Sequence, residues 1–290
     1  MKKTLIAFAL IIVCGMFYSQ AASAQAQAQA PAPFDPPVVK AFADSLYEEG
    51  FLLQAEGEYK RYLFSTDEVD QTAILSLTNI YKKQNDIAGI TWLKEGFFDS
   101  AEPLVKEKIN HVQAGFIFKE RNAEAFSDFV QSQTFSGHQS LFSPQFVNLV
   151  NASDLLLKKD IPGLKALCSE TAPQFSVFQP LADLSASYKT KKPALALLFS
   201  MVLPGSGKWY TGSFGAFFSS FMSVGSFVAG TVITGIQTSW KSWQPYVFGT
   251  CALVLYITDL YGSYQSAKRY NDALFRILCE ETDKLYEVTY

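Results

Sequence analysis

The segment from residue 193 to residue 271 constrains the fold of this 290-residue chain most, because it is rich in long apolar runs. Ser213–Ile236 is 24 residues long without a charged side chain, and the 17 residues Gln244–Leu260 are apolar apart from Asp259. Both lengths fall within the range of about 17–25 residues that a membrane-spanning helix needs. Trp240 and Trp243 lie between the runs, where interfacial aromatic residues are expected. The pattern predicts a transmembrane helical hairpin.

The number of membrane segments stays open at this stage. Pro193–Leu203 is also apolar, but its 11 residues would extend about 17 Å as a helix, which is short for a span. Two spans return Lys268 and Arg269 to the side from which the segment started, whereas three spans place them on the opposite side. Length favours two spans and the positive-inside rule favours three. We prefer two spans preceded by a re-entrant first segment.

Small residues recur along the first long run. Gly215, Ser219 and Ser223 are spaced by four residues, and Ser226, Gly230 and Thr234 repeat the pattern. Small residues let helices approach closely in lipid, so we expect these to pack within the hairpin rather than to line a pore. Asp259 is expected near the interface in a capping or packing role.

The N-terminus has the features of a secretory leader. Lys2 and Lys3 precede an apolar stretch from Thr4 to Tyr18, and Ala22-Ser23-Ala24 forms a small-x-small cleavage site. We therefore expect a signal peptide over residues 1–24; a retained membrane anchor is the alternative. Residues 25–37 are an Ala, Gln and Pro tract with little to bury, which predicts a disordered linker.

Residues 38–188 have helical periodicity interrupted by turn signals. The turn markers lie at Gly50, Asn85, Asn122 and Asp160, so their spacings are 35, 37 and 38 residues. A period of this length is typical of stacked helix pairs, each of which needs its neighbour to complete the core. The fold class predicted for the chain is therefore all-α.

The first of these units resembles a tetratricopeptide repeat. The resemblance is carried by Leu46, Gly50, Ala55 and Tyr59. It weakens in the later units, which lack the glycine at the turn. It implies a concave surface that binds a protein or peptide.

The Gly205-Ser206-Gly207-Lys208 stretch suggests a phosphate-binding loop at first sight. That loop requires a glycine five positions before Gly207 and a serine or threonine after the lysine. Val202 and Trp209 occupy these positions. We therefore expect no nucleotide to bind here.

The same stretch resembles the turn of a family of small bacterial membrane modules, some of which are joined to N-terminal tetratricopeptide repeats. The turn motif consists of Pro204, Gly205, Gly207, Tyr210 and Gly212, and the closing motif of Tyr261, Gly262, Tyr270 and Asn271. Lys208 and Asp259 depart from the family, in which Gln and Asn are frequent at these positions. The resemblance implies a membrane module over residues 189–271 followed by an amphipathic tail over 272–290, and no particular activity.

The sequence contains no recognisable catalytic or metal-binding motif. The two histidines, His111 and His138, are far apart and without neighbouring ligands, so no metal, cofactor or enzymatic activity is expected. The net charge of −3 offers no broad basic surface for nucleic acid. We expect a scaffold in the bacterial inner membrane, whose hairpin is surrounded by lipid. Residues 38–188 are expected to be exported to the periplasm, where they bind a protein or peptide. The alternative is a small oligomeric transport or channel component with accessory repeats.

Overall fold

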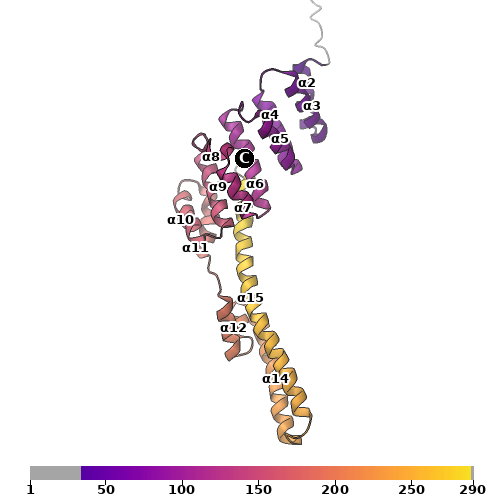
Figure 1. Ribbon diagram of the computed structural model, residues 1–290, viewed down its shortest axis with the longest axis vertical. Coiled ribbons are helices and arrows are strands. Elements are labelled where there is room, and N and C mark those ends of the chain that lie inside the picture. Colours follow the sequence, from indigo (N-terminus) through magenta and orange to yellow (C-terminus); the bar gives the residue numbers. More distant parts are fainter. Residues whose placement is uncertain (1–33, 289–290) are drawn as a thin grey trace, which may run out of the picture. The chain divides into compact units, whose positions relative to one another are not determined.

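The computed structural model describes residues 34–288 and, within that range, contains helices and no strands (Figure 1). The predicted all-α class is confirmed. The α-helices are α2 (Pro36–Glu48), α3 (Leu52–Ser65), α4 (Gln71–Gln84), α5 (Ile87–Phe97), α6 (Pro103–Lys119), α7 (Ala123–Gln131), α8 (Gln133–Ser136), α9 (Pro144–Leu157), α10 (Ile161–Thr171), α11 (Gln179–Ser187), α12 (Pro193–Val202), α13 (Ser206–Tyr210), α14 (Phe214–Thr238) and α15 (Gln244–Val288), with 3-10 turns at η1 (Gln139–Leu141) and η2 (Ser176–Phe178).

The predicted signal peptide (residues 1–24) and residues 25–33 of the predicted linker lie outside the described residues. The last residues of that linker are helical, since α2 begins at Pro36. Proline suits this position because its fixed φ matches the first helical turn, where its missing N–H costs no hydrogen bond.

The chain divides into two compact units between Gln113 and Ala114, a boundary that lies inside α6. In the first unit, two of the expected turns separate α2 from α3 and α4 from α5. Gly50 and Asn85 lie there with φ of 85° and 57°, in the left-handed region that glycine and asparagine tolerate best. Ala55 and Tyr59 of α3 are fully buried, and the Tyr59 hydroxyl donates to Asp44 Oδ1 at 2.6 Å.

In the second unit, the other two expected turns separate α6 from α7 and α9 from α10. The left-handed residues here are Arg121 (φ 56°) and Lys159 (φ 61°). The following residues, Asn122 and Asp160, accept hydrogen bonds from the first backbone N–H groups of α7 and α10. In these two units the turn is marked by the capping residue that follows it and not by a glycine. A repeat motif that requires a glycine at the turn therefore matches them poorly.

Helix α15 is the main element of the second unit (Figure 1). Its 45 residues would extend about 67 Å at 1.5 Å per residue. Its first part packs against α12, α13 and α14, and its end packs against α9 and α11. One uninterrupted helix runs across the position at which a membrane module (189–271) and a tail (272–290) are expected to meet.

The end of α15 completes the core of the helices that precede it. Leu278, Leu285 and Tyr286 are buried in the same cluster as residues of α6, α7, α9 and α10. The Tyr286 hydroxyl lies 3.0 Å from Ser153 Oγ, and Arg121 forms an ion pair with Asp283. Because this core needs α15, the predicted 38–188 domain is not a compact unit by itself.

Helices α14 and α15 lie side by side and antiparallel (Figure 1). The Phe227 and Phe248 rings are 6.1 Å apart, and Gly230 packs on Phe248. Gly215, Ser219 and Ser223 are exposed on α14 instead, so this part of the small-residue stripe does not pack within the pair as expected. The bulkier Phe217 and Val224 occupy the less exposed face.

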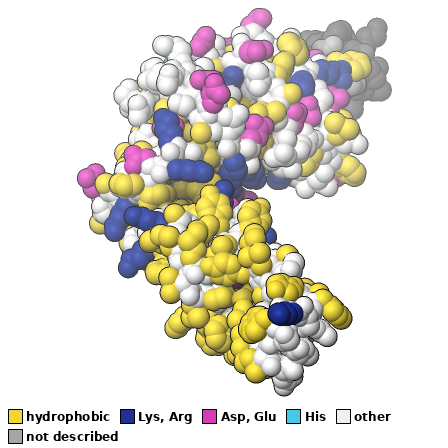
Figure 2. Space-filling view, turned by 60° about the horizontal axis from the view of Figure 1, so that its bottom comes forward, with side chains coloured by type: hydrophobic (Ala, Val, Ile, Leu, Met, Phe, Trp, Pro, Cys, Tyr) yellow, Lys and Arg dark blue, Asp and Glu magenta, His cyan; other side chains and the backbone are white. Residues whose placement is uncertain are grey.

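Among the described helices, α14 alone is long and apolar enough throughout to cross a membrane by length and composition. Only 6% of its most apolar 18-residue window is buried, unlike the core helix of a water-soluble protein. The first part of α15 is less apolar because it starts with Gln244 and Pro245 and contains Asp259. Figure 2 shows hydrophobic side chains covering much of the surface at this end of the second unit.

Candidate functional site

The turn motif is held by side chains from α12 and α15. Gly205 has φ of 85°, and its N–H donates to Asp259 Oδ2 at 2.6 Å. The N–H of Gly207 donates to Ser200 Oγ at 2.9 Å, and Ser200 Oγ in turn donates to Ser263 Oγ at 2.7 Å. These bonds supply partners for backbone N–H groups at the start of α13, which the helix itself cannot satisfy.

Gly207 is the point of closest approach in this cluster. A Cβ built on it would lie 2.7 Å from the Ala196 carbonyl carbon and 2.8 Å from Ser263 Cβ. Real Cβ atoms do not approach other atoms this closely, so only glycine lets α12, α13 and α15 meet at this position.

Lys208 and Asp259 form an ion pair in which Asp259 is buried and Lys208 is half-buried. Lys208 Nζ lies 2.8 Å from Asp259 Oδ1 and donates to Ser220 Oγ of α14, while the Asp259 side chain is only 3% exposed. The expectation of a capping or packing role for Asp259 is met by this geometry. The two residues that depart from the module pattern are therefore partners of each other.

The closing motif attaches the start of α12 to α15. Asn271 accepts from the Lys191 backbone N–H and donates to the Lys191 carbonyl, both at 2.8 Å. The Lys191 ammonium lies over the rings of Tyr210 and Tyr270, at 4.7 and 5.8 Å from their centroids. The Tyr210 hydroxyl also accepts from the Lys192 N–H at 3.4 Å.

The remaining motif residues have separate roles. Pro204 precedes the turn and is half-buried, and Gly212, with φ of 88°, follows α13. Gly262 faces the Lys208 side chain. Tyr261 points away from the cluster and is 65% exposed. The predicted repeat residues Leu46, Gly50, Ala55 and Tyr59 belong to the first compact unit.

Ser200, Ser220 and Ser263 are the site residues that the sequence interpretation missed. A signal existed for Ser200, which is the only polar side chain in the run 193–203. A polar side chain buried in an apolar segment needs a hydrogen-bond partner, so its isolation indicates a contact elsewhere in the chain.

The two histidines have different environments. Burial, together with the charges of Lys82 and Lys108, lowers the pKa of His111 to about 3, so its imidazole is neutral at pH 7. His138 is half-buried, and its Nδ1 lies 3.3 Å from the Gln133 carbonyl. Burial also raises the pKa of the Cys168 and Cys279 thiols to about 11. Within residues 34–288, no group of three or more His, Cys, Asp or Glu side chains could hold a metal ion.

Comparison with known proteins finds no match among family models, curated proteins or solved structures.

Proposed function

We propose that the protein is a membrane-anchored scaffold of the bacterial cell envelope, whose helical repeats bind a protein or peptide partner. The observation that carries the proposal is the continuity of α15, which is apolar and exposed along its first part and buried in the domain core at its end. One continuous helix therefore joins the proposed membrane anchor to the helices of the second unit.

The anchor in this proposal is a transmembrane hairpin of α14 and the first part of α15. The 25 residues of α14 extend about 37 Å, enough to cross a hydrocarbon core of about 30 Å. The 10 residues of α12 extend about 15 Å and reach partway at most. The end of α15 packs against α9 and α11, which precede the hairpin, so these helices lie on one side of the membrane. Two crossings meet this condition and three do not, which supports the two-span arrangement.

The orientation of the hairpin follows from the leader, which directs the following residues to the periplasm. Six of the seven basic residues in 189–271 lie near the domain end of the hairpin, and Lys241 lies at the opposite tip. The positive-inside rule applied to these residues alone would place the domain in the cytoplasm. We give precedence to the leader because the first apolar segment usually sets the orientation.

The partner-binding role rests on the stacked helix pairs and on exposed apolar side chains in the first unit. Successive helix pairs, with turns at 50 and 85 in the first unit, are typical of repeat architectures that present concave binding surfaces. Phe42, Phe51 and Leu53 are 54%, 50% and 72% exposed. Exposure of large apolar side chains to water is unfavourable, and a bound partner would bury them.

Site-specific photocrosslinking in intact cells tests the binding role. A photoreactive amino acid at Phe42, Phe51 or Leu53 is expected to yield one discrete crosslinked species, and the exposed Lys165 of α10 serves as the control. The absence of a crosslink at all three positions, or the same species from the control, would count against the proposal.

A small oligomeric transport or channel component remains the second candidate. It is favoured by the exposed Gly215, Ser219 and Ser223 on α14, because small residues on a lipid-facing surface let a second helix approach. Disulfide crosslinking between copies through Ser219→Cys would support it, whereas a monomer in the membrane would exclude it.

A further inference from the structure

Residues 189–271 carry an excess of positive charge. Residues 189–271 contain seven basic residues and one acidic residue, within a chain whose net charge is −3. The single acid, Asp259, is buried and already paired with Lys208. The other basic side chains in this range have no acidic partner within it. The next acid along α15 is Asp272, three residues after Arg269, and the two form no ion pair in the described residues.

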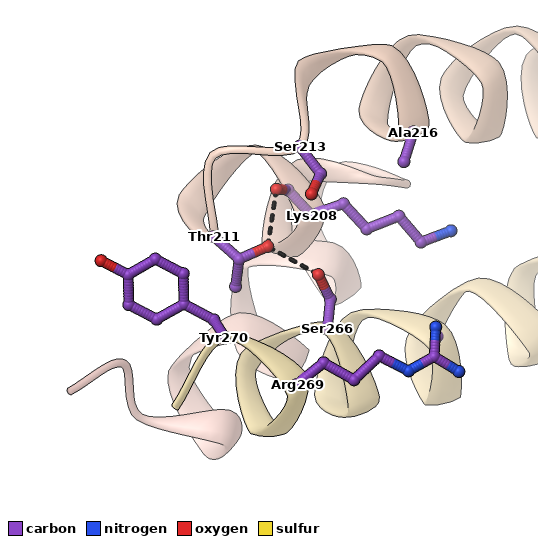
Figure 3. Close-up of a pocket in the computed structure, with 8 residues that line it drawn as sticks. Lys208, Thr211, Ser213, Ala216, Ser266, Arg269 and Tyr270 are labelled. Carbon is purple, nitrogen blue, oxygen red and sulfur yellow. Dashed lines mark hydrogen bonds between the residues drawn. The ribbon is translucent and has the colours of Figure 1, made fainter. Parts of the chain in front are cut away.

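A polar cavity lies between the α13–α14 connection and α15, with a volume of about 500 Å³. Figure 3 shows Lys208 and Arg269 entering from opposite walls, with their charged ends on the same side of the cavity. No acidic side chain lines it. Its polar lining includes Lys208, Thr211, Ser213, Ser266 and Arg269.

The hydrogen bonds in this cavity leave several donors for a ligand. Thr211 Oγ1 donates to the Lys208 carbonyl at 2.8 Å, so Ser266 must donate to Thr211 across their 2.7 Å contact (Figure 3). Lys208 Nζ donates to Ser220 Oγ and lies 2.8 Å from Asp259 Oδ1 as an ion pair. Arg269 is exposed and forms no ion pair with any residue between 34 and 288. The Arg269 guanidinium and the Ser213 hydroxyl are therefore open to an acceptor.

The cavity lies at the level of the lipid headgroups if α14 and α15 form the proposed hairpin, on which this inference rests. Arg269 is ten residues beyond Asp259 on the same helix, a rise of about 15 Å toward the domain end. Aromatic rings suited to the interface lie at this level. The Lys268 ammonium lies 5.0 Å from the centroid of Tyr264, and Trp209 is 58% exposed.

We propose that this cavity binds a phosphate group, presented by the headgroup of an anionic phospholipid. A phosphate offers several acceptor oxygens, and the planar arginine fork binds two of them at once. The cavity supplies the unpaired Arg269 guanidinium, a hydroxyl and the Lys208 ammonium, whose charge is shared with Asp259, and no acid lines it. These are groups that a phosphodiester can accept hydrogen bonds from. Arg269 is the residue on which binding depends most, because its charge is otherwise unpaired.

The test uses the full chain in detergent, titrated with phosphatidylglycerol or with phosphatidylcholine of the same acyl length, and followed by native mass spectrometry. Arg269→Gln is expected to weaken phosphatidylglycerol binding about tenfold, the factor that corresponds to a charge-assisted hydrogen bond of about 1.4 kcal/mol. Lys268→Gln is the matched control, since it removes the neighbouring exposed charge outside the cavity. Arg269→Lys should retain part of the affinity.

Competition with inorganic phosphate distinguishes the source of the group. Resistance of bound phosphatidylglycerol to millimolar phosphate supports a lipid site, and displacement with the same dependence on Arg269 supports a site for free phosphate. Equal losses in the two glutamine variants, or no preference over phosphatidylcholine, would overturn the proposal. Flotation of the protein with vesicles is measured in parallel: failure to float contradicts the hairpin, whereas flotation without selectivity contradicts only the phosphate site.

Discussion

Replacement of Gly207 with alanine is expected to cause the largest loss of stability of any single methyl group added to the module. The new Cβ would overlap the Ala196 carbonyl and lie 2.8 Å from Ser263 Cβ. The Ala196 carbonyl is backbone, so relief requires α12 or α13 to move as a whole, which also breaks the Ser200–Gly207 and Ser200–Ser263 bonds. We expect a cost of at least about 3 kcal/mol, the upper end for overpacking.

The measurement is the thermal unfolding of the purified full chain in detergent, followed by its intrinsic fluorescence. Gly215→Ala is the control, because Gly215 has open space around its Cα and lies on an exposed face of α14. It should be neutral or slightly stabilising, as alanine favours the helix by about 1 kcal/mol over glycine. Equal melting temperatures for the two variants would contradict the close approach at Gly207.

Removal of one partner of the Lys208–Asp259 pair is the second change with a large expected effect. Lys208→Ala leaves a carboxylate that is 3% exposed without its counter-charge, at an expected cost of about 3–5 kcal/mol. Asp259→Ala leaves the ammonium unpaired and also removes the acceptor for the Gly205 N–H. Each single variant should therefore lower the melting temperature strongly.

The double variant Lys208→Gln with Asp259→Asn is expected to be more stable than Lys208→Ala or Asp259→Ala. An asparagine oxygen can still accept from Gly205, and the amide pair can hydrogen-bond without a buried charge. A double-mutant cycle through Lys208→Gln and Asp259→Asn separates the pairwise interaction from the separate effects of the two residues. Strict additivity would show that the two side chains do not act as a pair.

Local features of this fold follow well from the sequence. Gly50 and Asn85 mark turns directly, and Asn122 and Asp160 do so as helix caps after Arg121 and Lys159. These are short-range effects of backbone conformation and capping, which residue type largely determines. The motif glycines are informative for the same reason, since a positive φ or a close approach excludes other residues.

Long-range packing did not follow from the sequence. The sequence predicts the end of α15 only as an amphipathic tail over 272–290, because helical periodicity alone cannot tell which partner an apolar stripe meets. A signal for its continuity exists, because residues 263–290 contain neither glycine nor proline. The orientation of Gly215 and Ser219 was missed because α14 is apolar nearly all round, so that no face is marked for burial.

The central claim is that α14 and α15 form a hairpin that returns the chain to the side of the second unit's helices. Thiol labelling with a membrane-impermeant maleimide tests it, with single cysteines at Lys165 (in α10), Ser239 (at the tip) and Val288 (at the end of α15). These positions are exposed, whereas the native Cys168 and Cys279 are buried and the half-buried Cys251 is replaced by serine in every variant. In cells with a permeabilised outer membrane, we predict labelling at 165 and 288, and labelling at 239 only after lysis. Labelling of 165 and 288 from opposite sides, or of all three positions from one side, would contradict the hairpin.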